Sequence, residues 1–146
     1  MRTPFNRFAL GVLSFAFVLA GGTPAIAESV TFKANLDGQS EVPANDSKGS
    51  GTVDAKYDTA SMKLTWTVTY SGLTGPVTAA HFHGPAKPAE NAGPVITLSV
   101  PLTSPTKGEE TLTKAQADEL GNGLWYLNVH TAAHPNGEIR GQLMKK

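Results

Sequence analysis

The chain of 146 residues contains no cysteine and only four histidines, and it has one long apolar run, at its N-terminus. The lack of cysteine excludes disulfides, thiolate metal sites, cysteine nucleophiles and a lipid-modified N-terminal cysteine. Apart from the lysine pair at 145–146 there is no basic cluster, which argues against a nucleic-acid partner. No phosphate loop, Ser/His/Asp motif or paired-carboxylate motif is present, so hydrolase chemistry has no support.

The N-terminal run has the pattern of a secretory signal peptide. Arg2 and Arg7 precede the apolar stretch 8–20, which is too short for a comfortable membrane span, and a small-x-small triplet ends at Ala27. We expect cleavage between Ala27 and Glu28, so that residues 1–27 are removed and residues 28–146 form one exported domain, periplasmic or secreted. The alternative is an uncleaved anchor, which the two glycines and the proline directly after the run disfavour.

The expected mature chain is weakly acidic. Loss of the two arginines leaves 10 Lys+Arg against 12 Asp+Glu, a net charge near −2. No second apolar run follows, so we expect no membrane association after cleavage. About 120 residues suffice to build a hydrophobic core without disulfides.

Alternating apolar and polar residues predict strands along most of the mature chain. The clearest segment is 62–70, where five apolar side chains share one face; the other predicted strands are 29–36, 51–57, 77–83, 95–100, 124–131 and 138–144. A capping box from Thr113 to Gln116 and a helix end at Gly121 predict one short helix. The pattern indicates an all-β protein, an antiparallel β-sandwich with plausible Greek-key connections, although strand order is not readable.

All four histidines lie in two short stretches, 81–83 and 130–134. If Phe82 faces the core, His81 and His83 point together to the opposite side of their strand. Two imidazoles so placed can bind one metal ion, and imidazole suits copper or zinc. The alternative is that they are ordinary hydrogen-bonded histidines that fix the following turn, and the same alternative applies to His130.

The last hairpin predicts where His130 points. A two-residue turn would place polar and apolar faces together, whereas a three-residue loop at the Pro-Asn-Gly segment pairs His130 with Gln142 and His134 with Glu138. His130 and Arg140 then share one outward face. The opposite, apolar face holds Leu127, Val129, Ile139 and Leu143.

Three motifs resemble the CHRD domain, a family named from chordin and widespread in exported bacterial proteins. They are HFHGPA (81–86), GLWYLNVHT (123–131) and NGEIRGQL (136–143), and the loop LDGQSEVPA (36–44) also fits. The resemblance covers 30–144 and implies an immunoglobulin-like sandwich. One hypothesis is therefore an exported interaction module of this type, whose loops engage protein or matrix partners and which has no metal or catalytic role.

A weaker resemblance is to the sandwich of copper/zinc superoxide dismutase, which carries a His-x-His strand, a later strand histidine and an arginine near its C-terminus. It implies that His81, His83 and His130 are copper ligands and that Arg140 guides anions. His134 is a candidate fourth ligand without motif support; its alternative is a solvent-exposed turn residue. The chain lacks that family's cysteine pair and zinc subsite, and redox chemistry would require bound copper.

The other side chains of this face have simpler expected roles. Arg140 could instead form a cross-strand ion pair with a carboxylate such as Glu138. Glu138, Gln142 and Asn128 are the candidates to orient the histidines. Tyr126 and Asn128 are expected to pack under a loop that covers this face. We thus keep two hypotheses: a metal-binding domain, with copper favoured and zinc as the alternative, and an interaction module without metal.

Overall fold

The computed structural model describes residues 28–146, which form nine strands and one helix. The strands are β1 (Ser29–Asp37), β2 (Ser50–Asp58), β3 (Lys63–Ser71), β4 (Val77–His83), β5 (Pro94–Thr97), β6 (Thr106–Thr111), β7 (Tyr126–Thr131), β8 (Ile139–Gln142) and β9 (Met144–Lys145), and the helix is α1 (Lys114–Gly121). The expected signal peptide and its cleavage site lie at the edge of or outside these residues. Within 28–146, no helix has the length and apolar character needed to cross a membrane.

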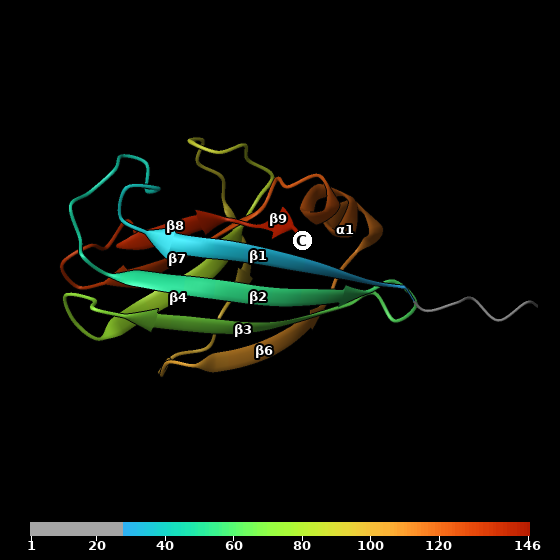
Figure 1. Cartoon of the computed structure of the whole chain (residues 1–146), viewed down its shortest axis with the longest axis horizontal. Coiled ribbons are helices and arrows are strands. Elements are labelled where there is room, and N and C mark those ends of the chain that lie inside the picture. The colour runs from blue at the N-terminus through green and yellow to red at the C-terminus, as the bar shows by residue number, and fades with distance from the viewer. Residues whose placement is uncertain (1–27) are drawn as a thin grey trace, which may run out of the picture.

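All strand pairs are antiparallel, and the strand order is β5-β4-β7-β8-β1-β2-β3-β6. Strands β1, β2, β3 and β6 form one layer, and β5, β4, β7 and β8 form the other (Figure 1). The two layers join where Asp37 of β1 pairs with Arg140 of β8, and β9 pairs with the middle of β1, at Phe32 and Lys33. The last strands thus return beside the first one, as expected for a Greek-key sandwich.

Period-two alternation explains how the two layers pack. In β1, β2 and β3 every second residue is buried, so each strand gives one apolar face to the interior. Trp66 of β3 meets Phe82 of β4 with ring centroids 5.1 Å apart in an edge-to-face arrangement, so the layers touch through aromatic side chains. Phe82 is fully buried, as expected, and its two neighbouring histidines consequently face away from the core.

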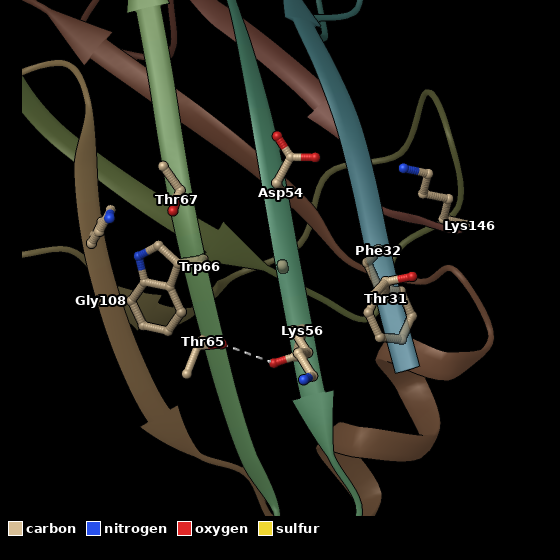
Figure 2. Close-up of a pocket in the computed structure, with 11 residues that line it drawn as sticks. Thr31, Phe32, Asp54, Lys56, Thr65, Trp66, Thr67, Gly108 and Lys146 are labelled. Carbon is tan, nitrogen blue, oxygen red and sulfur yellow. Dashed lines mark hydrogen bonds between the residues drawn. The ribbon is translucent and has the colours of Figure 1, made fainter. Parts of the chain in front are cut away.

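Two strands were not predicted as separate elements, namely β6 and the two-residue β9. The segment of β6, TKGEET, contains no apolar side chain, yet it pairs with β3 along six residues. Gly108 lies opposite Trp66, and a Cβ at Gly108 would come within 2.5 Å of the indole (Figure 2). The Trp66 indole of β3 therefore occupies the space that is free because Gly108 of β6 has no side chain. Strand β5 ends at Thr97, earlier than predicted.

The predicted helix is present, with its capping box intact. The Thr113 hydroxyl accepts a hydrogen bond from the Gln116 backbone, and the Gln116 side chain accepts one from the Thr113 backbone. Helix α1 lies at one end of the sandwich, beside the C-terminus (Figure 1). The indole of Trp125, a core residue as expected, donates to Glu119 of this helix and joins it to the sheet.

The last hairpin keeps the predicted faces but not the predicted loop. Asn128 pairs with Arg140 and Val129 with Ile139, so the three-residue loop is wrong and the register differs from the prediction by four residues. Because four is even, the faces are unchanged, and the predicted apolar face is buried. The connection is longer and contains a turn in which Thr131 and His134 exchange backbone hydrogen bonds.

The polar face of β7 and β8 is buried rather than outward. Tyr126, Asn128 and Arg140 are 2%, 4% and 2% exposed. The connection between β4 and β5 covers them, because the Arg140 guanidinium donates to the Glu90 carbonyl and the Tyr126 hydroxyl hydrogen-bonds to the backbone of that connection. The expectation that Tyr126 packs under a loop is confirmed, and Asn128 is buried as well. The sandwich thus has a second, polar interior beside the histidines.

Candidate metal centre

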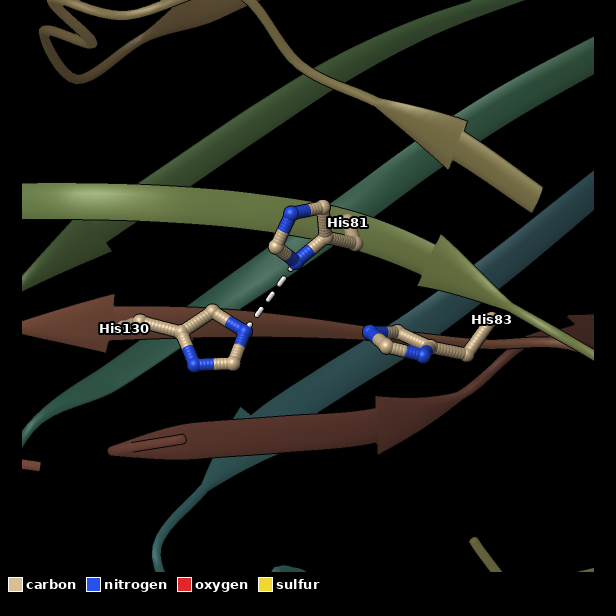
Figure 3. Close-up of side chains that lie close together, drawn as sticks. All are labelled: His81, His83 and His130. Atoms are coloured by element: carbon tan, nitrogen blue, oxygen red, sulfur yellow. Dashed lines mark hydrogen bonds between the residues drawn. The ribbon is translucent and has the colours of Figure 1, made fainter. Parts of the chain in front are cut away.

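Three of the four histidines meet on the face of β4 and β7 that turns away from the apolar core. In the β4–β7 ladder Ala79 pairs with His130 and His81 pairs with Asn128, which places His130 beside the two β4 histidines. One ring nitrogen from each of His81, His83 and His130 can be chosen so that all three lie within 4.8 Å of one another. The three rings turn toward a common centre (Figure 3).

Hydrogen bonds to backbone carbonyls assign the tautomers of two rings. His83 Nδ1 lies 2.9 Å from the Ala92 carbonyl and His130 Nδ1 lies 3.0 Å from the Pro135 carbonyl, so each Nδ1–H donates. The Nε2 atom of each ring therefore carries a lone pair rather than a proton. His81 Nδ1 is 3.1 Å from His130 Nε2 and donates to it when no ion is bound.

This pattern matches the way histidine ligands are usually held. A metal-binding imidazole generally donates its other N–H to a carbonyl or carboxylate, which fixes the ring and its tautomer. The natural donor set is His81 Nδ1, His83 Nε2 and His130 Nε2, and a metal ion would replace the proton between His81 and His130. His83 Nε2 is buried and has no hydrogen-bond partner among the described residues, so its lone pair is unused by the fold.

The surroundings keep the three imidazoles neutral. Burial lowers the pKa of His81, and the neighbouring His130 and His83 lower it further. Burial also lowers the pKa of His83 and of His130, although the hydrogen bonds to the Ala92 and Pro135 carbonyls oppose the shift. Neutral imidazole is the form that binds metal, so the cluster is ready to coordinate at neutral pH.

The remaining predicted site residues lie apart from the three rings. His134 occupies the turn between β7 and β8 and does not belong to the three-histidine group. The guanidinium of Arg140 donates to Asn91 Oδ1 and to the Glu90 carbonyl, and it stacks 3.4 Å from the centroid of the Tyr126 ring. It forms no ion pair with Glu138, which is the alternative weighed for it.

Of the three side chains expected to orient the histidines, only Asn128 contacts one. The Asn128 carboxamide approaches His83. Gln142 donates to the Ala86 and Gly123 carbonyls and so anchors the covering loop. The Glu138 carboxylate is held by Ser47, Thr74 and Thr131 at one end of the sandwich.

Sequence reasoning missed the groups that hold the rings. The carbonyls of Ala92 and Pro135 carry no side-chain signal that could have identified them. The Tyr126 ring stacks parallel to the His83 ring, with centroids 4.8 Å apart. The guanidinium of Arg140, from β8, lies over the Tyr126 ring. Glu41, which lies in the predicted polar loop after β1, is only 6% exposed and lies near Arg140.

The separation of up to 4.8 Å between the three ring nitrogens is slightly larger than one bound ion allows. Ligands about 2 Å from one ion lie no more than roughly 4 Å apart, so binding would draw the rings together by roughly 1 Å. A three-imidazole set without thiolate or carboxylate suits copper or zinc, and copper forms the stronger complexes with a given nitrogen set. The arrangement can therefore hold one such ion and leave a coordination position open.

A sizeable hollow on the surface lies away from the histidines. It has a volume of about 640 Å³ and lies over β1, β2, β3 and β6, lined by threonines and lysines such as Thr65 and Lys107 (Figure 2). None of its lining residues is a histidine. The rest of its lining includes the core side chains of Phe32 and Trp66, and no predicted site residue belongs to it.

Comparison with known proteins gives one result. The family model of the CHRD domain matches residues 32–143, which is most of the described chain. A search of curated proteins and a search of solved structures gave no match.

Proposed function

Since the chain belongs to the CHRD family, we propose that it is an exported CHRD-domain protein that binds one metal ion through His81, His83 and His130, with copper favoured and zinc as the alternative. The observation that carries this proposal is the convergence of three ring nitrogens within 4.8 Å. The free lone pair of His83 Nε2 and the carbonyl-fixed tautomers support it.

Export is part of the same proposal. Cleavage between Ala27 and Glu28 would release the domain into a compartment where an imidazole site does not compete with cellular thiols. The intact mass of the protein recovered from the periplasm or the medium should correspond to a chain that starts at Glu28. Recovery of a product that retains the apolar run would contradict this part.

Copper binding by histidine variants tests the metal site. Wild-type protein should bind one equivalent of Cu(II), and His83→Ala should weaken binding by at least tenfold because it removes one of three ligands. His134→Ala is the matched control, since it removes the one histidine outside the group and should change the affinity little. Competition between copper and zinc, followed by metal analysis, decides the metal.

Two outcomes would overturn the metal proposal. Either the triple variant His81→Ala/His83→Ala/His130→Ala binds copper as well as the wild type, or the wild type binds no copper and no zinc. The interaction-module hypothesis would then remain. Redox activity should be assayed only in the copper-loaded protein. The anion-guiding role of Arg140 stays a prediction, which the same assay can examine.

A further inference from the structure

Residues 28–146 contain three buried side-chain polar atoms without a hydrogen-bond partner, and all three lie together. They are Glu41 Oε1, Asn128 Oδ1 and His83 Nε2. The Asn128 carboxamide lies close to both the Glu41 carboxyl and the His83 ring, although these contacts are too long or too bent to satisfy all of the atoms. Unpartnered buried polar groups are rare in folded proteins, so their concentration beside a metal-site candidate points to a role there.

Glu41 reaches this place from the connection between β1 and β2. It is 6% exposed, and Gly137 leaves room for it: a Cβ there would lie 2.3 Å from Glu41 Oε1 and 2.8 Å from Asn128 Nδ2. Because both side chains flank the same glycine, the amide nitrogen of Asn128 lies on the side of the carboxyl group. The positive charge of Arg140 is the nearby charge that acts on this carboxyl group.

The position of Glu41 determines which atom of the Asn128 carboxamide faces His83. When Asn128 Nδ2 turns toward Glu41, Oδ1 turns toward His83 Nε2. An amide oxygen cannot donate a hydrogen bond, so it leaves the Nε2 lone pair free, and its partial negative charge favours a cation bound there. If the amide were reversed, Nδ2–H would cap that lone pair and compete with a metal ion.

We propose that Glu41 is a positioning residue of the histidine site, acting through the orientation of the Asn128 carboxamide on His83. The proposal rests on the metal-binding function proposed above. A carboxylate at this position accepts from Nδ2 only, whereas a glutamine can either accept or donate and no longer selects one orientation of Asn128. Hydrogen-bonded groups behind a metal ligand commonly change the metal affinity by 10- to 100-fold.

The test compares Glu41→Gln with Glu90→Gln at pH 8. Burial raises the pKa of Glu41 to about 7, so the wild-type carboxyl group is mainly ionised at pH 8. Glu90 is an exposed carboxylate in the loop that covers the site, which makes it the matched control. Glu41→Gln should weaken Cu(II) binding about tenfold in competition with a chelator. Glu90→Gln should leave the affinity unchanged.

Two further measurements separate positioning from a structural effect. In metal-free protein the long-range ¹⁵N–¹H spectrum should show His83 Nε2 unprotonated, and Glu41→Gln should shift that nitrogen while the His134 signals stay in place. In a double-mutant cycle with Asn128→Ala, Glu41→Gln should have no additional effect on copper affinity. A purely structural role would lower the stability of the apoprotein and leave the shift of His83 Nε2 unchanged.

The outcomes distinguish this inference from the proposed function. Copper binding by the wild type with an unchanged affinity and an unchanged His83 Nε2 signal in Glu41→Gln overturns the positioning role alone. Absence of copper binding in the wild type, together with a shifted Nε2 signal in the variant, overturns the metal function and retains the positioning. If Glu41→Gln does not fold, Glu41→Asp replaces it as the test, because the shorter side chain keeps the charge but moves it away from Asn128. Glu41→Asp should also weaken copper binding. An unchanged copper affinity in Glu41→Asp overturns the proposal.

Discussion

At the scale of single residues, Gly137 is fixed by two independent constraints. Its φ of +128° lies in a region that side chains rarely adopt, and a Cβ would collide with the Glu41 carboxyl group. Gly137→Ala should therefore lower the free energy of unfolding by about 2 kcal/mol or more, measured in urea. Gly93→Ala, where a Cβ meets nothing within 4 Å, should change it little.

The two constraints at Gly137 can be separated. In a Glu41→Ala background the collision with the Glu41 carboxyl group is relieved, while the close contact with Asn128 Nδ2 and the backbone strain remain, so Gly137→Ala should cost less there than in the wild type. An equal cost in both backgrounds would show that the close approach of Glu41 contributes nothing.

The candidate site was predictable where it follows from strand parity. Alternation around Phe82 places His81 and His83 on one face, and the same rule placed His130 on the corresponding face of β7. The carbonyl partners of the rings and the arrival of Glu41 were not predictable. They depend on the paths of three loops, and local side-chain patterns do not determine how such loops fold back over a sheet.

At the scale of secondary-structure elements, α1 depends on its capping box. Thr113→Ala removes the hydroxyl that accepts from the Gln116 backbone, so it should lower the free energy of unfolding by about 1 kcal/mol. The matched control is Thr111→Ala at the exposed end of β6, which should have little effect. Equal effects of the two substitutions in urea denaturation would argue against the cap.

The elements that could be predicted are those with a clear apolar period or a specific cap. Strands β1, β2, β3 and β4 and helix α1 fall within a residue or two of expectation. β6 was not predictable because it buries no apolar side chain and is held by its ladder to β3 and by the Trp66 indole over Gly108. The register of the last hairpin was wrong because Glu138 bonds to distant loops, which local parity does not encode.

At the scale of the whole molecule, Glu138 joins three connections at one end of the sandwich. Its fully buried carboxylate accepts from Ser47, from the backbone and hydroxyl of Thr74 and from Thr131. Burial alone would raise its pKa, but these hydrogen bonds outweigh burial and lower the pKa below the ordinary value of 4.5. The ionised group therefore stabilises the fold at pH values above about 4.5, and this contribution is lost as the pH falls through the folded-state pKa.

Glu138→Gln should accordingly lower the free energy of unfolding at pH 7 by about 2 kcal/mol, because it weakens charge-assisted hydrogen bonds. The difference from the wild type should shrink as the pH falls below 4.5, which urea denaturation at several pH values can follow. Glu110→Gln, at an exposed position of β6, is the control and should show neither effect. A loss of stability independent of pH would mean that shape rather than charge is what matters at Glu138.

The contact between Glu41 and Gly137 links two segments that lie almost a hundred residues apart, and it has a consequence for how the sequence can evolve. While a long carboxylate occupies position 41, only glycine is tolerated at position 137 without a collision. Once position 41 becomes small, position 137 loses its closest steric contact and keeps the conformational constraint and the contact with Asn128. The two positions should therefore drift as a pair in descendant sequences, with the change at 41 preceding the change at 137.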